Sequence, residues 1–551
     1  MFRLIRPLPR RVTRPVSVVV VIAWLAVMAV LVDRTLIRAA ATNLATDLAR
    51  YGSAAAWNGV YYRGEKIGFT VNQTVAKGDG FEIDEDGRLQ MALLGATTPA
   101  TIHTRADVDA SFTLQAFEFS LDPGTGAVAV RGKVDGNRIA LTIATPSGER
   151  TEVRTLPEPP ALSLNLSRRL AAGGLKAGAH YTWTVFDPAT LRNAPVVVDV
   201  GKREIVIAAS KPVPAFRVEM QFTGLKTTSW MTDTGEVVRE ESPLGLITVR
   251  ETAQSAQAMA VPGRIRSDLL HEAAVVPTAT RRQRTRIDEP RDVRRLQLRI
   301  SGVDLSSFRG AGAPGSNDDM QGAGQTVEGD VVTLVDPQSL VAGPGDRDAA
   351  KYLAPEALIE SDDPEIHAEA LKAIGTATGP RDKAERITRH VNAILDKKPT
   401  VSLPSAREVL RTRIGDCNEH TALFVAMARS VGVPSRIAVG LVYVHGAFYY
   451  HAWPEVYIDE GRNRGLWLPV DPTLNEFPAD ATHVRVTRGG LEKQVEILPL
   501  IGKIKIAMLD LELAPNSTPI LVGRQPADLG PLSVPIPKKT AGGCWSASCC
   551  R

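Results

Sequence analysis

Cysteine is scarce in this chain of 551 residues, which contains four. A scaffold held together by disulfides is therefore excluded. Three of the four, Cys544, Cys549 and Cys550, lie at the C-terminal end, so Cys417 stands alone in the body of the chain. In an oxidising compartment we expect a disulfide among the three, or intermolecular pairing through the odd one. A metal site there is disfavoured because no histidine lies nearby.

An excess of charge of one sign is also missing. Lysine and arginine number 65 against 61 acidic residues, which gives a net charge of +4. A nucleic-acid binder usually carries a concentrated basic face, so we expect no nucleic-acid partner. No acidic loop has the ligand spacing of a calcium site, and the glycine-rich segment 310–324 lacks the order of a phosphate-binding motif. We therefore expect no metal and no cofactor.

The chain is too long for one ordinary core, and changes in composition divide it. The middle, with short alternating segments such as Phe112–Phe119 and turn signals such as Asp122-Pro123-Gly124, predicts an antiparallel β-rich domain. The predicted units are a basic tail at 1–14, an apolar segment at 15–33, a linker at 34–56, the β-rich domain at 57–260, a second linker at 261–350, a domain carrying Cys417 at 351–490 and an extension at 491–551.

One long apolar run lies near the N terminus, directly after five arginines that no acid interrupts. Eighteen residues of helix rise about 27 Å, just enough to cross a bilayer core. We therefore predict a transmembrane anchor at 15–33, with 1–14 in the cytoplasm and the bulk of the chain in the periplasm of a single-pass inner-membrane protein. A cleavable signal peptide is the alternative, but charged residues separate the run from the small residues at 39–41.

The second linker begins with an arginine-rich stretch at 261–295, which acidic residues break up. We interpret it as solvated, with a contact to an anionic polymer as the alternative.

Cys417 follows Gly415 and Asp416 and precedes apolar residues at helical spacing that end at Gly432. This pattern places the cysteine at the N terminus of a buried helix, where the helix dipole stabilises a thiolate. Inert packing is the alternative for a lone cysteine in an apolar setting. Further helices are predicted at 366–374, 380–395 and 406–410, and strands at 436–444, 449–458 and 466–470.

His451 lies in the second of these strands, and Asp471 follows the third. A carboxylate on an adjacent strand can hold the imidazole in one tautomer, so we predict His451 as a base oriented by Asp471. A turn-forming role before Pro472 is the alternative for Asp471. His420, three residues after Cys417, is a rival base, but it has no evident orienting partner.

Three separated blocks of this segment resemble the transglutaminase-like domain in order and spacing. They are Gly415-Asp416-Cys417-Asn418-Glu419-His420, then His451-Ala452-Trp453-Pro454-Glu455, then Asp471-Pro472-Thr473. The resemblance covers about residues 350–490 and implies a papain-like α+β fold. It also implies Cys417 as nucleophile, His451 as base and Asp471 as orienting acid.

The sequence departs from the family pattern at two points. Pro454 lies in the histidine-bearing strand, where it must avoid a ladder hydrogen bond. No tryptophan lies between Trp230 and Trp453, whereas the eukaryotic cross-linking enzymes use one upstream of the cysteine. The backbone N–H of Cys417 is therefore the safest candidate for an oxyanion donor. Glu455 is interpreted as a support of the site or as a charge at a sheet edge.

A looser resemblance concerns the β-rich domain. Tyr62–Phe69, Leu175–Gly178 and Trp230–Val237 resemble a domain that precedes transglutaminase-like domains in bacterial envelope proteins. It implies a curved sheet that binds a lipid or an envelope partner, with a spacer as the alternative.

Together these observations predict a multidomain chain with a transmembrane helix, an antiparallel β-rich domain and an α+β papain-like domain. The predicted function is a membrane-anchored cysteine acyl-transfer enzyme that acts on amide bonds of peptides or proteins through a Cys-His-Asp triad and a thioester. Water or an amine would resolve the thioester. The alternative is a non-catalytic envelope binding or scaffold protein with the same fold.

Overall fold

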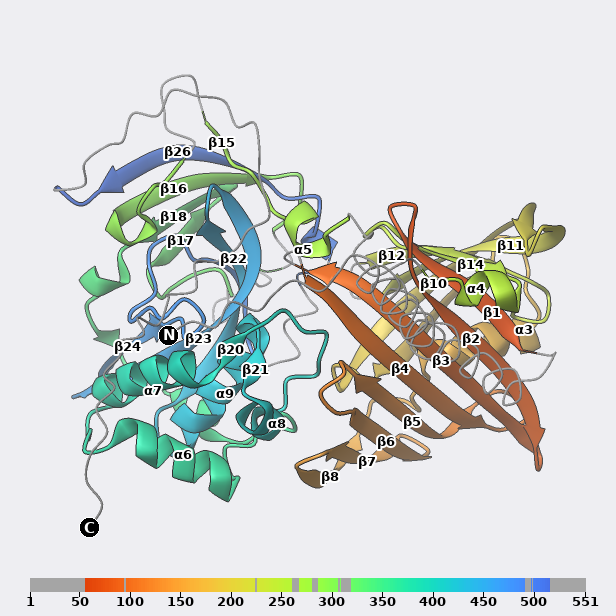
Figure 1. The fold of residues 1–551 in the computed structure, drawn as a ribbon, viewed down its shortest axis with the longest axis horizontal. Helices are drawn as coiled ribbons and strands as arrows, with labels where there is room; N and C mark the ends of the chain where they lie inside the picture. The colour runs from red at the N-terminus through yellow and green to blue at the C-terminus, as the bar shows by residue number, and fades with distance from the viewer. Residues whose placement is uncertain are drawn as a thin grey trace, which may run out of the picture.

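The computed structural model describes residues 55–515, except for 94–95, 223–224, 260–266, 280–285, 306–307, 309–318, 491–496 and 498. Two bodies lie side by side, a β-rich body and an α+β body (Figure 1). The basic tail, the predicted anchor, most of the first linker, most of the glycine-rich segment and the three C-terminal cysteines lie outside the described residues.

The β-rich body is one antiparallel sheet of 14 strands in the order β8-β7-β6-β5-β4-β3-β2-β1-β14-β13-β12-β11-β10-β9. Two meanders, β1–β8 and β9–β14, meet where β1 pairs with β14. Its strands are β1 (Ala56–Tyr62), β2 (Glu65–Lys77), β3 (Gly80–Leu93), β4 (Ala96–Val108), β5 (Leu114–Asp122), β6 (Val128–Asp135), β7 (Arg138–Thr145), β8 (Gly148–Thr155), β9 (His180–Asp187), β10 (Arg192–Ala208), β11 (Lys211–Phe222), β12 (Leu225–Met231), β13 (Val237–Glu241) and β14 (Leu246–Glu251).

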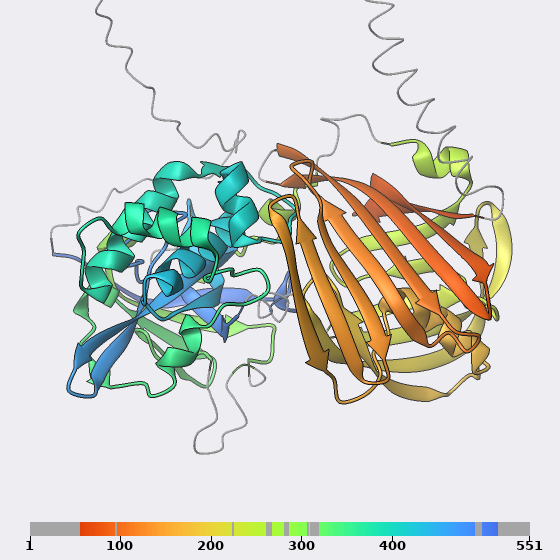
Figure 2. The same cartoon turned by 90° about the horizontal axis from the view of Figure 1, so that it is seen from below.

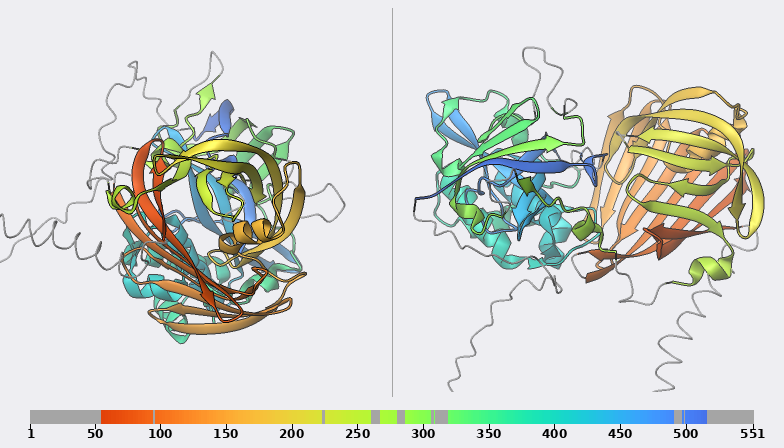
Figure 3. Two further views of the ribbon diagram at one scale, coloured as in Figure 1. Left: turned by 90° about the vertical axis from the view of Figure 1, so that its right-hand side faces the viewer. Right: turned by 90° about the horizontal axis from the view of Figure 1, so that it is seen from above.

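This sheet curves around the helix α3 (Ser163–Ala172), which connects its two edge strands (Figure 3). Leu166 and Leu170 of α3 pack in one apolar cluster with Val185 of β9. Asn165, which is fully buried, accepts from the N–H of Leu162 at 2.8 Å and donates to the carbonyl of Phe112 at 2.8 Å. The helix therefore ties the start of the second meander to the first.

Within the described residues, the α+β body contains two five-stranded sheets. The first is antiparallel, and the second is mixed because β15 pairs in parallel with β26. The first has the order β19 (Gly343–Pro344), β24 (Arg464–Pro469), β23 (Ala447–Gly461), β22 (Ser435–Val444) and β25 (Val484–Gly489). The second has the order β15 (Thr278–Ala279), β26 (Lys505–Leu513), β16 (Val293–Ser301), β18 (Val331–Val335) and β17 (Gln325–Glu328). One hydrophobic cluster joins both sheets and the helices.

The longer helices that the structure describes in this body (Figure 2) are α6 (Pro364–Ile374), α7 (Pro380–Ile394), α8 (Ala406–Thr412) and α9 (Cys417–Ser430). The helix α9 packs against β22 and β23 on one side and against the other three helices on the other. It is therefore enclosed by protein over most of its length, and Ala422 to Ala428 are all fully buried. Shorter helices are α4 (Ala253–Gln257) and α5 (Leu269–Glu272), with 3-10 turns at Pro290–Asp292, Pro337–Ser339 and Ala349–Leu353.

The two bodies touch where turns of the curved sheet meet α8. Ser147 Oγ donates to Glu408 Oε2 at 3.0 Å, and Arg411 Nη2 donates to the carbonyl of Thr125 at 3.0 Å. Arg150 forms an ion pair with Asp362 at 2.9 Å. Two of these contacts reach α8, which directly precedes α9, and the third lies just before α6.

The prediction of a transmembrane anchor at 15–33, and the single-pass inner-membrane location inferred from it, are corrected here. No helix in the described residues is long and apolar enough to cross a membrane. Even α7, with 15 residues, rises only about 22 Å, well short of a bilayer core. Residues 15–33 themselves lie outside the described part of the chain.

A buried ion-pair network stiffens the first sheet. Glu455 of β23 is fully buried and accepts from Arg436 of β22 at 2.8 Å and from Arg485 of β25. The Arg436 guanidinium also lies 3.8 Å from the ring centroid of Trp467. Glu455 is thus neither at a sheet edge nor exposed, and it neutralises two arginines that the apolar sheet encloses.

We expect Glu455→Gln to destabilise the protein by about 3–5 kcal/mol at pH 7, because it removes the buried carboxylate that two buried guanidinium groups share. Burial alone would raise the pKa of Glu455, but the charges of Arg485 and Arg436 lower it from 4.5 to about 2. Its contribution is therefore present above pH 4.5 and is lost as the pH falls toward 2.

Urea unfolding at pH 7 and pH 3 measures both effects. The exposed Glu460 at the end of the same strand supplies the control Glu460→Gln, which should change little. Equal stability of Glu455→Gln and wild type at pH 7 would contradict the account.

Candidate active site

The turn before Cys417 is fixed by reciprocal helix capping. Asp416 Oδ1 accepts from the N–H of Asn418 at 3.0 Å, and Glu419 Oε2 accepts from the N–H of Asp416 at 2.8 Å. Thr400 Oγ1 donates to Glu419 Oε1 at 2.9 Å. At Gly415 a Cβ atom would lie 2.2 Å from Glu419 Cβ, so only glycine permits this capping arrangement. Cys417 is consequently the first residue of α9.

A short parallel ladder directly precedes the same turn. The two-residue strands β20 (Asp396–Lys397) and β21 (Ile414–Gly415) pair directly before Asp416.

The first turns of α9 lie against the histidine-bearing strand β23. Thr421 Oγ1 donates to the carbonyl of Ala452 at 3.1 Å. The backbone of Ala452 is close enough to the Cys417 thiol to lower its pKa. The cysteine thiol is therefore next to the backbone of the residue that follows His451.

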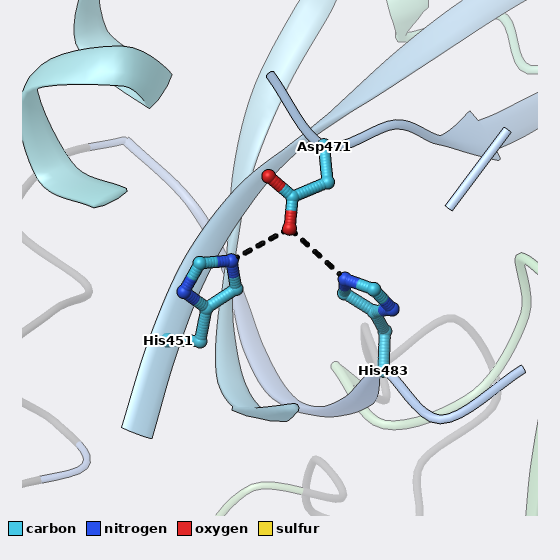
Figure 4. A group of neighbouring side chains, drawn as sticks. All are labelled: His451, Asp471 and His483. Atoms are coloured by element: carbon cyan, nitrogen blue, oxygen red, sulfur yellow. Dashed lines mark hydrogen bonds and ion pairs between the residues drawn. The ribbon is translucent and has the colours of Figure 1, made fainter. Parts of the chain in front are cut away.

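His451 lies on β23, and Asp471 follows the neighbouring strand β24 of the first sheet. His451 Nε2 lies 2.7 Å from Asp471 Oδ2 (Figure 4). The other carboxylate oxygen, Oδ1, accepts from the N–H groups of Thr473 at 2.7 Å and Leu474 at 2.9 Å. The N–H groups at 473 and 474 show that Asp471 forms the turn, which was the alternative role, and the same side chain also contacts His451.

The charge of Asp471 is well supported. Burial alone would raise its pKa, but the charges and hydrogen bonds of His451 and His483 hold the pKa of this fully buried carboxyl far below its ordinary value. Because an ionised carboxylate can only accept, Nε2 of His451 carries a proton. In the neutral ring Nδ1 is then the free base, and it lies on the side of the ring away from Asp471 (Figure 4).

His483 is the residue that the sequence analysis missed. Its Nε2 lies 3.1 Å from the same oxygen, Asp471 Oδ2, on the opposite side from His451 (Figure 4). It precedes β25, which pairs with β22 rather than with a sequence neighbour. No local pattern around His483 indicates this pairing, so only the tertiary fold reveals it.

Among the described residues, two groups of three side chains have ligand atoms within 4.8 Å of one another, as a metal site requires. One is His451, Asp471 and His483, and the other is Glu476, Asp480 and His483. The members are joined by direct hydrogen bonds, with both imidazoles on one oxygen of Asp471. We therefore describe them as a hydrogen-bonded ion-pair network.

The electrostatic setting of Cys417 differs from the expected low-pKa thiolate. Burial, followed by the charge of Asp416, raises the pKa of the thiol well above its ordinary value. The backbone of Ala452 acts in the opposite direction, but burial and Asp416 outweigh it. A resting thiol at Cys417 therefore needs a base in order to react.

His420 is not arranged as that base. Its Nδ1 lies 2.6 Å from the carbonyl of Asp416, one turn back on its own helix, and its side chain is fully buried. Burial lowers its pKa. Nε2 is buried and has no hydrogen-bond partner among the described residues.

Comparison with known proteins assigns a family to part of the chain. Residues 368–472 match the family model of the transglutaminase-like superfamily, so this part of the chain is a transglutaminase-like domain. The sequence resemblance is thereby confirmed, and the matched range includes Cys417, His451 and Asp471. No curated protein matches the chain.

Several solved structures are similar in part. One is a putative cysteine protease from Cytophaga hutchinsonii, at 21% identity over 35% of this chain and 66% of that chain, with a TM-score of 0.24. A protein with a domain of unknown function from Brucella abortus has 14% identity over 36% of this chain and 94% of that chain, with a TM-score of 0.29. A putative protease from Parabacteroides distasonis has 10% identity over 67% and 69%, with a TM-score of 0.19. These low scores add nothing to the assignment of function.

We expect Cys417 to react more slowly in the folded protein than in the unfolded one. Because its pKa is raised, the thiolate fraction at pH 7.4 should be lower than that of the same cysteine in urea. Iodoacetamide labelling followed by mass spectrometry of the Cys417 peptide measures both rates and separates them from the C-terminal cysteines. Faster labelling of the folded protein below pH 7 would contradict the raised pKa.

Proposed function

We propose that this protein is a cysteine acyl-transfer enzyme that acts on amide bonds of peptides or proteins. Its transglutaminase-like domain supports a papain-like enzyme in general. The observation that carries the finer proposal is the placement of the Cys417 thiol at the backbone of Ala452, beside a histidine whose Nε2 is bonded to Asp471. Nucleophile, base and orienting acid are the parts that such a reaction needs.

In the proposed first half-reaction, the Cys417 S–H proton moves to Nδ1 of His451 while the sulfur attacks the amide carbonyl carbon. The C–N bond then breaks, and His451 returns the proton to the leaving amine. The product is a thioester on Cys417. Asp471 stabilises the positive charge that His451 carries between these two proton transfers.

In the second half-reaction, water or an amine attacks the thioester carbonyl, and Nδ1 of His451 takes the proton of the attacking group. The C–S bond breaks, and the proton returns to the sulfur. Water gives hydrolysis, as in a peptidase or amidase, and an amine gives a new amide, as in a transglutaminase. The N–H of Cys417, which is the first residue of α9 and so lies outside the helix's own hydrogen bonds, is the proposed donor to the oxyanion.

We expect Cys417→Ala to lose all turnover and His451→Ala to lose about 10²–10⁴-fold, the usual contribution of a general base. The assay offers peptides that contain glutamine and internal amide bonds, with and without a primary amine. Mass spectrometry then detects new termini, deamidation or amine incorporation.

Acid quenching followed by intact mass measurement traps the thioester, whose added mass should map to Cys417. The exposed His445, in the hairpin that leads into the His451 strand, supplies the control His445→Asn, which should keep full activity. Turnover that survives in Cys417→Ala would contradict the proposal and would favour a binding or scaffold role.

A further inference from the structure

His483 occupies the side of Asp471 that His451 leaves free (Figure 4). Its side chain is 2% exposed, so the pairing takes place away from solvent. The indole ring of Trp453 lies edge-on to the His483 ring, with centroids 5.1 Å apart, and is nearly parallel to the His451 ring, at 6.1 Å. The two imidazoles and the indole therefore pack as one unit around a single carboxylate.

Both nitrogens of His483 face oxygen acceptors. Nε2 lies 3.1 Å from Asp471 Oδ2, and Nδ1 lies 3.2 Å from both Asp480 Oδ1 and the carbonyl of Asp480. A neutral imidazole has one N–H, whereas the imidazolium has two. The contacts thus require the cationic form. Burial alone would lower the pKa of His483, but the hydrogen bonds of Asp471 and Asp480 raise it well above its ordinary value.

Asp480 is itself held in place. Its Oδ1 accepts from the N–H of Thr482 at 2.8 Å and from Thr482 Oγ1 at 2.6 Å. Its own N–H donates to Glu476 Oε2 at 2.9 Å. Glu476 in turn exchanges two backbone hydrogen bonds with Asp471, at 2.8 and 2.9 Å. The segment 471–483 is therefore a closed loop that presents His483 back to the carboxylate at its beginning.

We propose that His483 is a positioning residue of the active site, which clamps Asp471 Oδ2 from the side opposite His451 and thereby fixes the orientation of the base toward Cys417. This inference rests on the function proposed above. His483 does not touch substrate and acts only through Asp471.

The clamp has an electrostatic consequence. The His451 and His483 ring centroids lie 6.0 Å apart, so the His483 cation opposes a second positive charge on His451. Loss of the His483 cation would remove this repulsion. Charged and titratable groups surround His483. His451 lies on β23, and Asp471, Glu476 and Asp480 lie in the loop, where Glu476 pairs with Arg291. Glu455 and Arg485 line a small cavity together with His483.

The test compares wild type with His483→Gln, whose amide can still donate to Asp471 but carries no charge. In the full-length protein we expect the acid limb of the kcat/KM profile to move to higher pH by at least about half a unit, with KM little changed. The alkylation profile of Cys417, which needs no substrate, should move in the same direction. A merely structural role would lower kcat at every pH without moving either profile.

Asp480→Asn provides a second variant in case His483→Gln does not fold. It leaves His483 in place but removes one of its two carboxylates, so a smaller shift in the same direction is expected. His445→Asn is the control and should match wild type. Superimposable profiles for wild type and both variants would overturn the clamp. Failure of the proposed function has a different signature, since turnover would then survive in Cys417→Ala whatever the alkylation profiles show.

Discussion

The carboxylate of Asp471 is the constraint on which the rest of the site depends. It is fully buried and accepts four hydrogen bonds, two from imidazoles and two from the backbone that follows it. An unpaired buried carboxylate would take up a proton, so these partners are what keep the negative charge in place. Because that charge is fixed, the proton of His451 lies on Nε2 and the opposite nitrogen is left as the base.

The surrounding fold can be understood as the support for this one group. The strand β23 carries His451 toward the N-terminal end of α9, and β24 ends where Asp471 begins its turn. Paired carboxyls at Asp416 and Glu419 hold the start of the helix and at the same time raise the pKa of the neighbouring thiol. The site therefore combines a cysteine thiol of raised pKa with a histidine that a buried carboxylate holds in one orientation.

The sequence predicted the parts of the molecule that local patterns encode. The helices α6, α7, α8 and α9 and the strands that carry His451 and precede Asp471 lie within a few residues of their expected positions, because apolar spacing, capping residues and turn signals act over short distances. The same local sequence signals predicted correctly that Cys417 lies at the start of a helix.

The features that the sequence did not predict depend on contacts between residues far apart in the chain. His483 reaches Asp471 only because β25 pairs with β22 across the sheet, and Glu455 is buried only because arginines from two other strands surround it. The thiol pKa was misjudged for a similar reason, since the helix dipole is visible in the sequence whereas burial and the nearby carboxyls are not. The anchor was inferred from hydropathy alone, and no described helix supports it.

The tautomer of His451 tests the central claim most directly. Nitrogen NMR of the full-length protein labelled with ¹⁵N-histidine, assigned by comparison with His451→Gln, reports which ring nitrogen carries the proton when the ring is neutral. The account predicts a protonated Nε2 and a bare Nδ1, with the difference weakened in Asp471→Asn. A neutral His451 protonated on Nδ1 would mean that Asp471 does not orient the base, and the proposed active site would then be wrong.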